Sequence, residues 1–197
     1  VFAAAIMAAM ALGACGTSGI SGMSGGMSSG GASDSEDAQL AASPTNIASL
    51  TGVVQRNPND PQAYNMRGSV FGQAGRNAEA QADFDKAISL DANYTQAYAN
   101  RGLIERKTGK LDQALADYNK ALALDQNYAA AYLGRGIVYR MRKQPLEAFN
   151  DFNKAIAIRP DNAEAYYNRG LLYQSQKQHQ YAIDDFSTAI GLTQNKA

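Results

Sequence analysis

The feature that most constrains this fold is a sequence pattern that recurs every 34 residues. A tyrosine followed by an Arg-Gly pair opens each of four units, at residues 64–68, 98–102, 132–136 and 166–170. Sixteen residues after the tyrosine comes an alanine, and four further on an aromatic, as in Ala80 and Phe84. Self-similarity at such a period indicates units that bury their apolar faces by stacking on one another. The pattern therefore predicts a linear array of like units and excludes one central core.

Each unit predicts two helices joined by a short turn. The expected pairs are residues 61–74 with 78–90, 95–108 with 112–124, 129–142 with 146–158, and 163–176 with 180–192. Gly68 and its equivalents fall inside the first helices, where glycine costs about 1 kcal/mol relative to alanine. Such a cost indicates that the second helix packs closely there. Gly75 and Gly109 fall at the turns, and Pro145 suits the first turn of its helix, where no N–H is required.

This arrangement resembles the tetratricopeptide repeat family, in which a helix–turn–helix unit recurs every 34 residues. The resemblance extends from Pro61 to about Asn195, without insertion. It implies an all-α solenoid of four repeats, at 61–94, 95–128, 129–162 and 163–196. Residues 45–60 resemble the end of a further unit, and we expect one helix there, from Asn46 to Arg56, that caps the array.

One departure from the family pattern is a periodic arginine where the family has leucine. An aspartate follows each arginine by 16 residues. The two series are Arg67, Arg101, Arg135 and Arg169, and Asp83, Asp117, Asp151 and Asp185. We expect Arg–carboxylate pairs that link the two helices of a repeat or one repeat to the next. The alternative is a row of arginines that binds anions.

The family resemblance also implies a concave groove, lined by the first helices, in which peptides bind. The corresponding positions are Asn65, Ser69, Ala99, Asn100, Leu103, Arg106, Lys107, Leu133, Ile137, Arg140, Met141, Tyr167, Asn168, Leu171 and Gln174. Asn100 and Asn168 match sites where related repeats hold a ligand backbone. Met66 and Gly134 interrupt that series, so a complete polar clamp is not expected.

Basic residues cluster at the ends of neighbouring first helices. They are Arg106, Lys107, Lys110, Arg140, Arg142 and Lys143. We interpret them as a site for acidic peptide segments, with phospholipid or glycan as the less favoured alternatives. The alternative is an ordinary solvated helix end.

At the other end of the array, no repeat follows the last helix to cover it. Ile183 and Ile190 are the candidates for an uncovered face. A terminal repeat normally needs a polar outer face. We therefore predict that this end meets a second copy, forming a homodimer, or a different partner.

The beginning of the chain predicts export and a lipid anchor. Residues 1–14 are uncharged and apolar, too short for a membrane span, and typical of a signal peptide that has lost its basic start. Leu12-Gly13-Ala14-Cys15 resembles the bacterial lipobox, which implies acylation of Cys15. The alternative is an ordinary signal peptide cut near Ala14. The Gly/Ser-rich residues 16–44 predict a disordered tether.

Composition excludes several function classes. Eighteen basic and eighteen acidic residues balance, which disfavours nucleic-acid binding. One cysteine and one histidine exclude an internal disulfide and a structural zinc site, and no cofactor motif occurs. His179 is expected in the turn before the last helix. No catalytic motif is present, so we do not expect an enzyme.

These patterns together predict a lipid-anchored adaptor of the bacterial cell envelope. We expect it at the outer membrane, facing the periplasm, where it would bind proteins or peptide segments without catalysis. One alternative is an assembly lipoprotein for pili or a secretion system. Another is a soluble periplasmic chaperone-like binder, which applies if Cys15 is not acylated.

Overall fold

The computed structural model describes residues 43–194, and the regular secondary structure within this range is all helical. The helices are α2 (Pro44–Arg56), α3 (Pro61–Gln73), α4 (Asn77–Leu90), α5 (Thr95–Lys107), α6 (Leu111–Leu124), α7 (Ala129–Met141), α8 (Pro145–Ile158), α9 (Ala163–Ser175) and α10 (His179–Gln194). The expected cap is α2. Its start is fixed by Ser43, whose hydroxyl accepts a hydrogen bond from the Asn46 amide. The predictions for residues 1–42, including Cys15, lie outside the described range.

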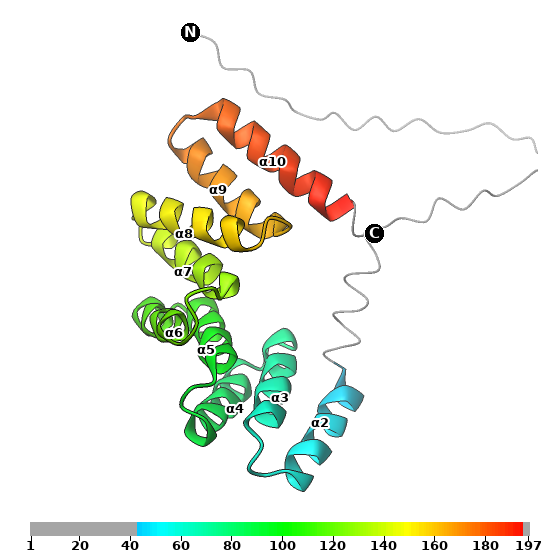
Figure 1. Cartoon of the computed structure of the whole chain (residues 1–197). Helices are drawn as coiled ribbons and strands as arrows, with labels where there is room; N and C mark the ends of the chain where they lie inside the picture. Colours follow the sequence, from blue (N-terminus) through cyan, green and yellow to red (C-terminus); the bar gives the residue numbers. More distant parts are fainter. Residues whose placement is uncertain (1–42, 195–197) are drawn as a thin grey trace, which may run out of the picture.

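The helices form a curved stack of antiparallel pairs (Figure 1). Each first helix packs on the second helix of its own repeat, as α3 does on α4, and each second helix packs on the next first helix. First helices of successive repeats also contact one another, which places α3, α5, α7 and α9 on the inner side of the curve. The prediction of an all-α solenoid of stacked helix pairs is confirmed.

Small residues in the first helices allow the close packing of each pair. A Cβ atom added to Gly68 would lie 2.8 Å from the ring of Phe84, and one added to Gly170 would lie 2.6 Å from the ring of Phe186. Both distances are shorter than a carbon–carbon contact. The glycines therefore make space for the aromatic of the second helix, as their interior positions predicted.

The turns inside the repeats reveal one feature that the sequence did not. Gly75 and Gly109 adopt positive φ, at 74° and 79°. Lys143 and Lys177 occupy the equivalent positions in the last two repeats, with φ of 58° and 60°. A side chain in this left-handed region is strained, so these two turns carry a local cost that the first two avoid.

The arginine and aspartate series pairs within each repeat. Arg101 donates from Nε and Nη2 to the two carboxylate oxygens of Asp117, both at 2.7 Å, and the other three pairs have the same geometry. The third guanidinium nitrogen reaches the preceding second helix. In three repeats it meets Asp85, Asn119 or Asn153 at 2.6–2.7 Å, and in the first it lies 3.5 Å from Thr51. Each arginine therefore links two repeats and is engaged inside the array.

Candidate functional site

The candidate site is a central cavity on the inner side of repeats 2 and 3, with a volume of about 280 Å³. Its lining is apolar where α5 and α7 meet, with Leu103, Leu133 and Ile137, and Ala99 completes this part. All four are groove positions that the family resemblance implied. The structure thus places the centre of the expected groove in one hollow.

Two cations and one anion lie at this central cavity. Arg106 enters from α5, Arg159 comes from the turn after α8, and Glu164 comes from the start of α9. Arg159 forms an exposed ion pair of 3.6 Å with Asp161. Sequence reasoning missed Arg159 and Glu164 because they belong to the next connection and helix, which only the curvature of the stack brings to this cavity.

Arg106 is the most distinctive group of the central cavity. Its Nε is buried and has no hydrogen-bond partner within the described residues, although the guanidinium lies within hydrogen-bonding reach of Tyr118. Burial raises the pKa of the Tyr118 hydroxyl to about 12, so that group stays protonated. Buried polar groups are normally satisfied, and the Nε of Arg106 is an exception among the described residues.

A polar network borders the central cavity on its N-terminal side. The Asn100 amide donates to the side-chain oxygen of Asn65 at 2.9 Å and to the Ser69 hydroxyl at 3.3 Å. Asn65 in turn donates to the hydroxyl of Tyr94 at 3.3 Å. Asn100 still lines the central cavity and also a smaller hollow of about 170 Å³ between repeats 1 and 2, which Ser69, Leu103 and Lys107 share.

Asn168 has a different environment from Asn100. It is buried, and its amide donates to the Glu164 carbonyl oxygen of its own helix at 2.9 Å. This hydrogen bond is internal to α9, and Asn168 does not line the central cavity.

The residues of the basic cluster have different environments. Arg142 pairs with Asp112, and Lys110 donates to Gln81 at 3.2 Å. Lys143 occupies the strained turn. Of the cluster, Arg106 lines the central cavity and Lys107 lines the hollow between repeats 1 and 2.

Two further groove positions lie at the end of α7, beside the basic cluster. The Nε of Arg140 is buried without a hydrogen-bond partner in residues 43–194, as in Arg106. Met141 is half exposed as the last residue of α7. Neither residue lines the central cavity.

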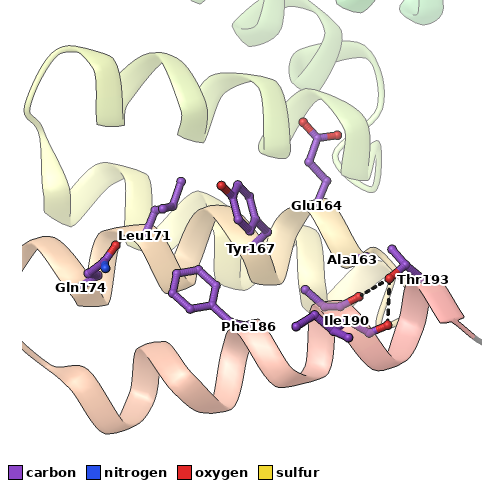
Figure 2. A pocket seen from close by; sticks show the side chains of 9 residues that line it. Ala163, Glu164, Tyr167, Leu171, Gln174, Phe186, Ile190 and Thr193 are labelled. Carbon is purple, nitrogen blue, oxygen red and sulfur yellow. Dashed lines mark hydrogen bonds between the residues drawn. The ribbon is translucent and has the colours of Figure 1, made fainter. Parts of the chain in front are cut away.

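Three of the four groove positions in the last repeat line a second, C-terminal cavity of about 650 Å³ between α9 and α10 (Figure 2). Tyr167, Leu171 and Gln174 face it from α9, and Phe186 and Ile190 from α10. Ile183 and Ile190 are both more than half exposed. The expected groove positions therefore line hollows both in the middle and at the end of the array.

His179 is the first residue of α10 and is exposed, which moves it one step from the turn where it was expected. In residues 43–194 no three metal-ligating side chains converge. No helix among these residues is both long and apolar enough to cross a membrane.

Family models match most of the helical region. A TPR repeat model matches residues 102–141 and 146–177, and tetratricopeptide repeat models match 61–94 and 163–195. The chain therefore belongs to the tetratricopeptide repeat family. A comparison with curated protein sequences found no significant match.

Solved structures with the same fold include MamA. A crystal structure of MamA is 25% identical, with a TM-score of 0.63 over 76% of this chain and 88% of that one. TTC0263, a TPR protein of Thermus thermophilus, is 22% identical, with a TM-score of 0.67 over 74% and 80%. A chain of the APC/C hetero-tetramer Cut9–Hcn1 is 20% identical, with a TM-score of 0.73 over 78% of this chain and 30% of that one. The fold is that of a protein-interaction scaffold, a class that is generally non-catalytic.

Proposed function

We propose that this protein is a non-catalytic adaptor that binds acidic peptide segments of its partners in the central cavity. The observation that carries this proposal is the pairing of an apolar lining with Arg106, whose buried Nε lacks a hydrogen-bond partner within residues 43–194. Leu103 and Ile137 would contact apolar side chains of the peptide. Arg106 and Arg159 would bind its carboxylates, because charge-assisted hydrogen bonds to arginine are the stronger kind.

A direct test uses two short fluorescein-labelled peptides that alternate leucine with either glutamate or lysine. Fluorescence anisotropy would follow their binding to the whole protein. We expect the glutamate peptide to bind and the lysine peptide not to bind. The change Arg106→Gln should weaken binding of the glutamate peptide by about tenfold, the equivalent of one charge-assisted hydrogen bond.

The matched control is Arg142→Gln, which removes a positive charge from the same cluster outside the central cavity. Arg142 already pairs with Asp112, so this variant should bind the glutamate peptide like the wild type. Equal losses in both variants would assign binding to general surface charge, and no loss in either would refute the proposal. Circular dichroism would establish that both variants keep their helices.

The proposed place of action is the bacterial cell envelope, through a lipid on Cys15. The sequence Leu12-Gly13-Ala14-Cys15 at the end of an apolar run supports this part of the proposal. Two or three acyl chains would anchor the protein stably, because each buried methylene contributes roughly 0.8 kcal/mol. Labelling of cells with a radioactive fatty acid tests it. Cys15→Ala should lose both the label and the membrane fraction, and a retained label would refute acylation at this residue.

A further inference from the structure

The C-terminal cavity has an equivalent in every earlier repeat, and there it is filled. The space between α5 and α6 holds α7, and the space between α7 and α8 holds α9. Ile190 is 56% exposed, whereas its equivalent Leu122 is 7% exposed. Tyr167 is 51% exposed, whereas its equivalent Leu133 is 8% exposed. The last repeat therefore presents the same inter-repeat interface with nothing from residues 43–194 covering it.

The helices that fill the earlier spaces share one contact pattern. An alanine is followed four residues later by arginine and three residues after that by an aliphatic residue. The three sets are Ala97, Arg101 and Ile104; Ala131, Arg135 and Val138; and Ala165, Arg169 and Leu172. All six alanine and aliphatic side chains are at most 3% exposed. Spacings of four and seven place these residues on one face of a helix.

Each position of this pattern has a defined counterpart. Ala131 and Val138 of α7 join the apolar cluster that contains Leu122, the equivalent of Ile190. The arginines donate to Asp85, Asn119 and Asn153, and the equivalent in the last repeat is Ser187, which is exposed. A hydroxyl oxygen at Ser187 preserves the ability to accept a hydrogen bond.

A contact outside the cavity also indicates that a further helix would fit against α10. In repeat 3, Phe149 packs edge-on against Tyr173 of α9, with ring centroids 5.4 Å apart. The equivalent of Phe149 is Ile183, which is 55% exposed. Ile183 and Ile190 therefore lie where a further first-type helix would contact α10.

We propose that the C-terminal cavity binds an amphipathic helix of a partner protein that carries alanine, arginine and an aliphatic residue at positions i, i+4 and i+7. The supporting argument is continuity with the interface already repeated three times along the array. A second folded copy is a poorer occupant, because its own helices with this pattern are buried at those positions. This site is distinct from the central cavity, although Glu164 lines both.

The test uses a fluorescein-labelled peptide with the sequence of residues 160–176, the natural occupant of the preceding space. Isolated helices of this length are marginal in water, so a lactam bridge on the face away from the contact holds the peptide helical. Anisotropy titrations use the whole protein. We expect saturable binding that Ile190→Asp weakens at least about tenfold.

Three controls decide the outcome. Leu146→Asp places the same charge at an exposed aliphatic position of α8 and should leave binding unchanged. A peptide with aspartate in place of Leu172 should bind at least about tenfold more weakly. Arg106→Gln should have no effect, which separates this site from the central cavity. No binding to the wild type, or binding insensitive to Ile190→Asp, would overturn the proposal.

Sedimentation analysis of the protein without peptide tests whether a second copy of this chain occupies the C-terminal cavity instead. A monomer supports the proposal, because the C-terminal cavity is then open to a partner helix. A dimer that Ile190→Asp dissociates would overturn it and assign the cavity to a second copy.

Discussion

Replacing Glu105 by glutamine should stabilise the protein in a pH-dependent way. Glu105 occupies the position that Phe71, Tyr139 and Tyr173 hold in the other repeats, and it is only 4% exposed. Burial and, to a lesser degree, the nearby Asp117 carboxylate raise the pKa of Glu105 from 4.5 to about 7. The side chain is thus poorly suited to carry a charge in the folded state.

The size of the expected stabilisation follows from this shift in the pKa of Glu105. One unit corresponds to 1.36 kcal/mol, so ionisation of Glu105 costs the folded state about 3 kcal/mol relative to the unfolded chain. Because the pKa of Glu105 is raised in the folded state, the protonated side chain contributes a stability that is fully present only below about pH 4.5. It is lost as the pH rises through about 7. Glutamine keeps a similar shape without the charge and avoids this loss.

Urea unfolding followed by circular dichroism at several pH values between 5 and 8.5 measures the effect. We expect the stability of Glu105→Gln relative to the wild type to rise by about 2–3 kcal/mol between pH 5 and pH 8.5. Other titrating groups are common to both proteins and cancel in the difference. Glu147→Gln, a change at an exposed carboxylate of α8, should show no such trend. A difference that is the same at every pH would refute the reasoning.

Three further predictions concern the turns, the ion pairs and the close helix packing. Lys143→Gly should raise the free energy of unfolding by about 1 kcal/mol, because it removes a side chain from the left-handed region; an unchanged urea midpoint would contradict this. Asp151→Ala should lower the free energy of unfolding by about 3 kcal/mol, because Arg135 then loses two hydrogen bonds. High salt applied to the wild type should not reproduce that loss. Gly136→Ala should lower the melting temperature through a loss of about 1–3 kcal/mol, because the added Cβ would lie 2.7 Å from an aromatic ring. Gly191→Ala, in open space on α10, should instead raise it by the helix-propensity gain.

The fold could be predicted almost completely because each repeat is a local unit. The 34-residue spacing, the interior glycines and the Arg–Asp series are all relations between residues close in sequence. Their partners, such as Arg67 and Asp83, lie in one helix pair. A solenoid has few contacts between distant residues, so little of its architecture depends on long-range structure. The strained turns at Lys143 and Lys177 escaped prediction, because lysine gives no signal for positive φ.

The candidate site was only partly predictable. The sequence placed Leu103, Leu133 and Ile137 on one side of the array, and the structure brings them into one cavity. It gave no reason to add Arg159 or Glu164, since the cavity they complete depends on how tightly the stack curves. Nor could it show that Asn168 is buried with its amide bonded to its own helix.

By itself, the sequence determined which residues form helices and how the helices pair. These properties depend on short spacings and on residue size. Only the tertiary structure decided which groove positions line the central and C-terminal cavities. It also decided that Arg106 retains a buried Nε without a hydrogen-bond partner in residues 43–194, and that Ile190 stays exposed where Leu122 is buried. The physical reason is that burial and hydrogen bonding depend on which neighbour the superhelical curvature brings to each side chain. The sequence of one repeat does not by itself specify those contacts with the adjacent repeats.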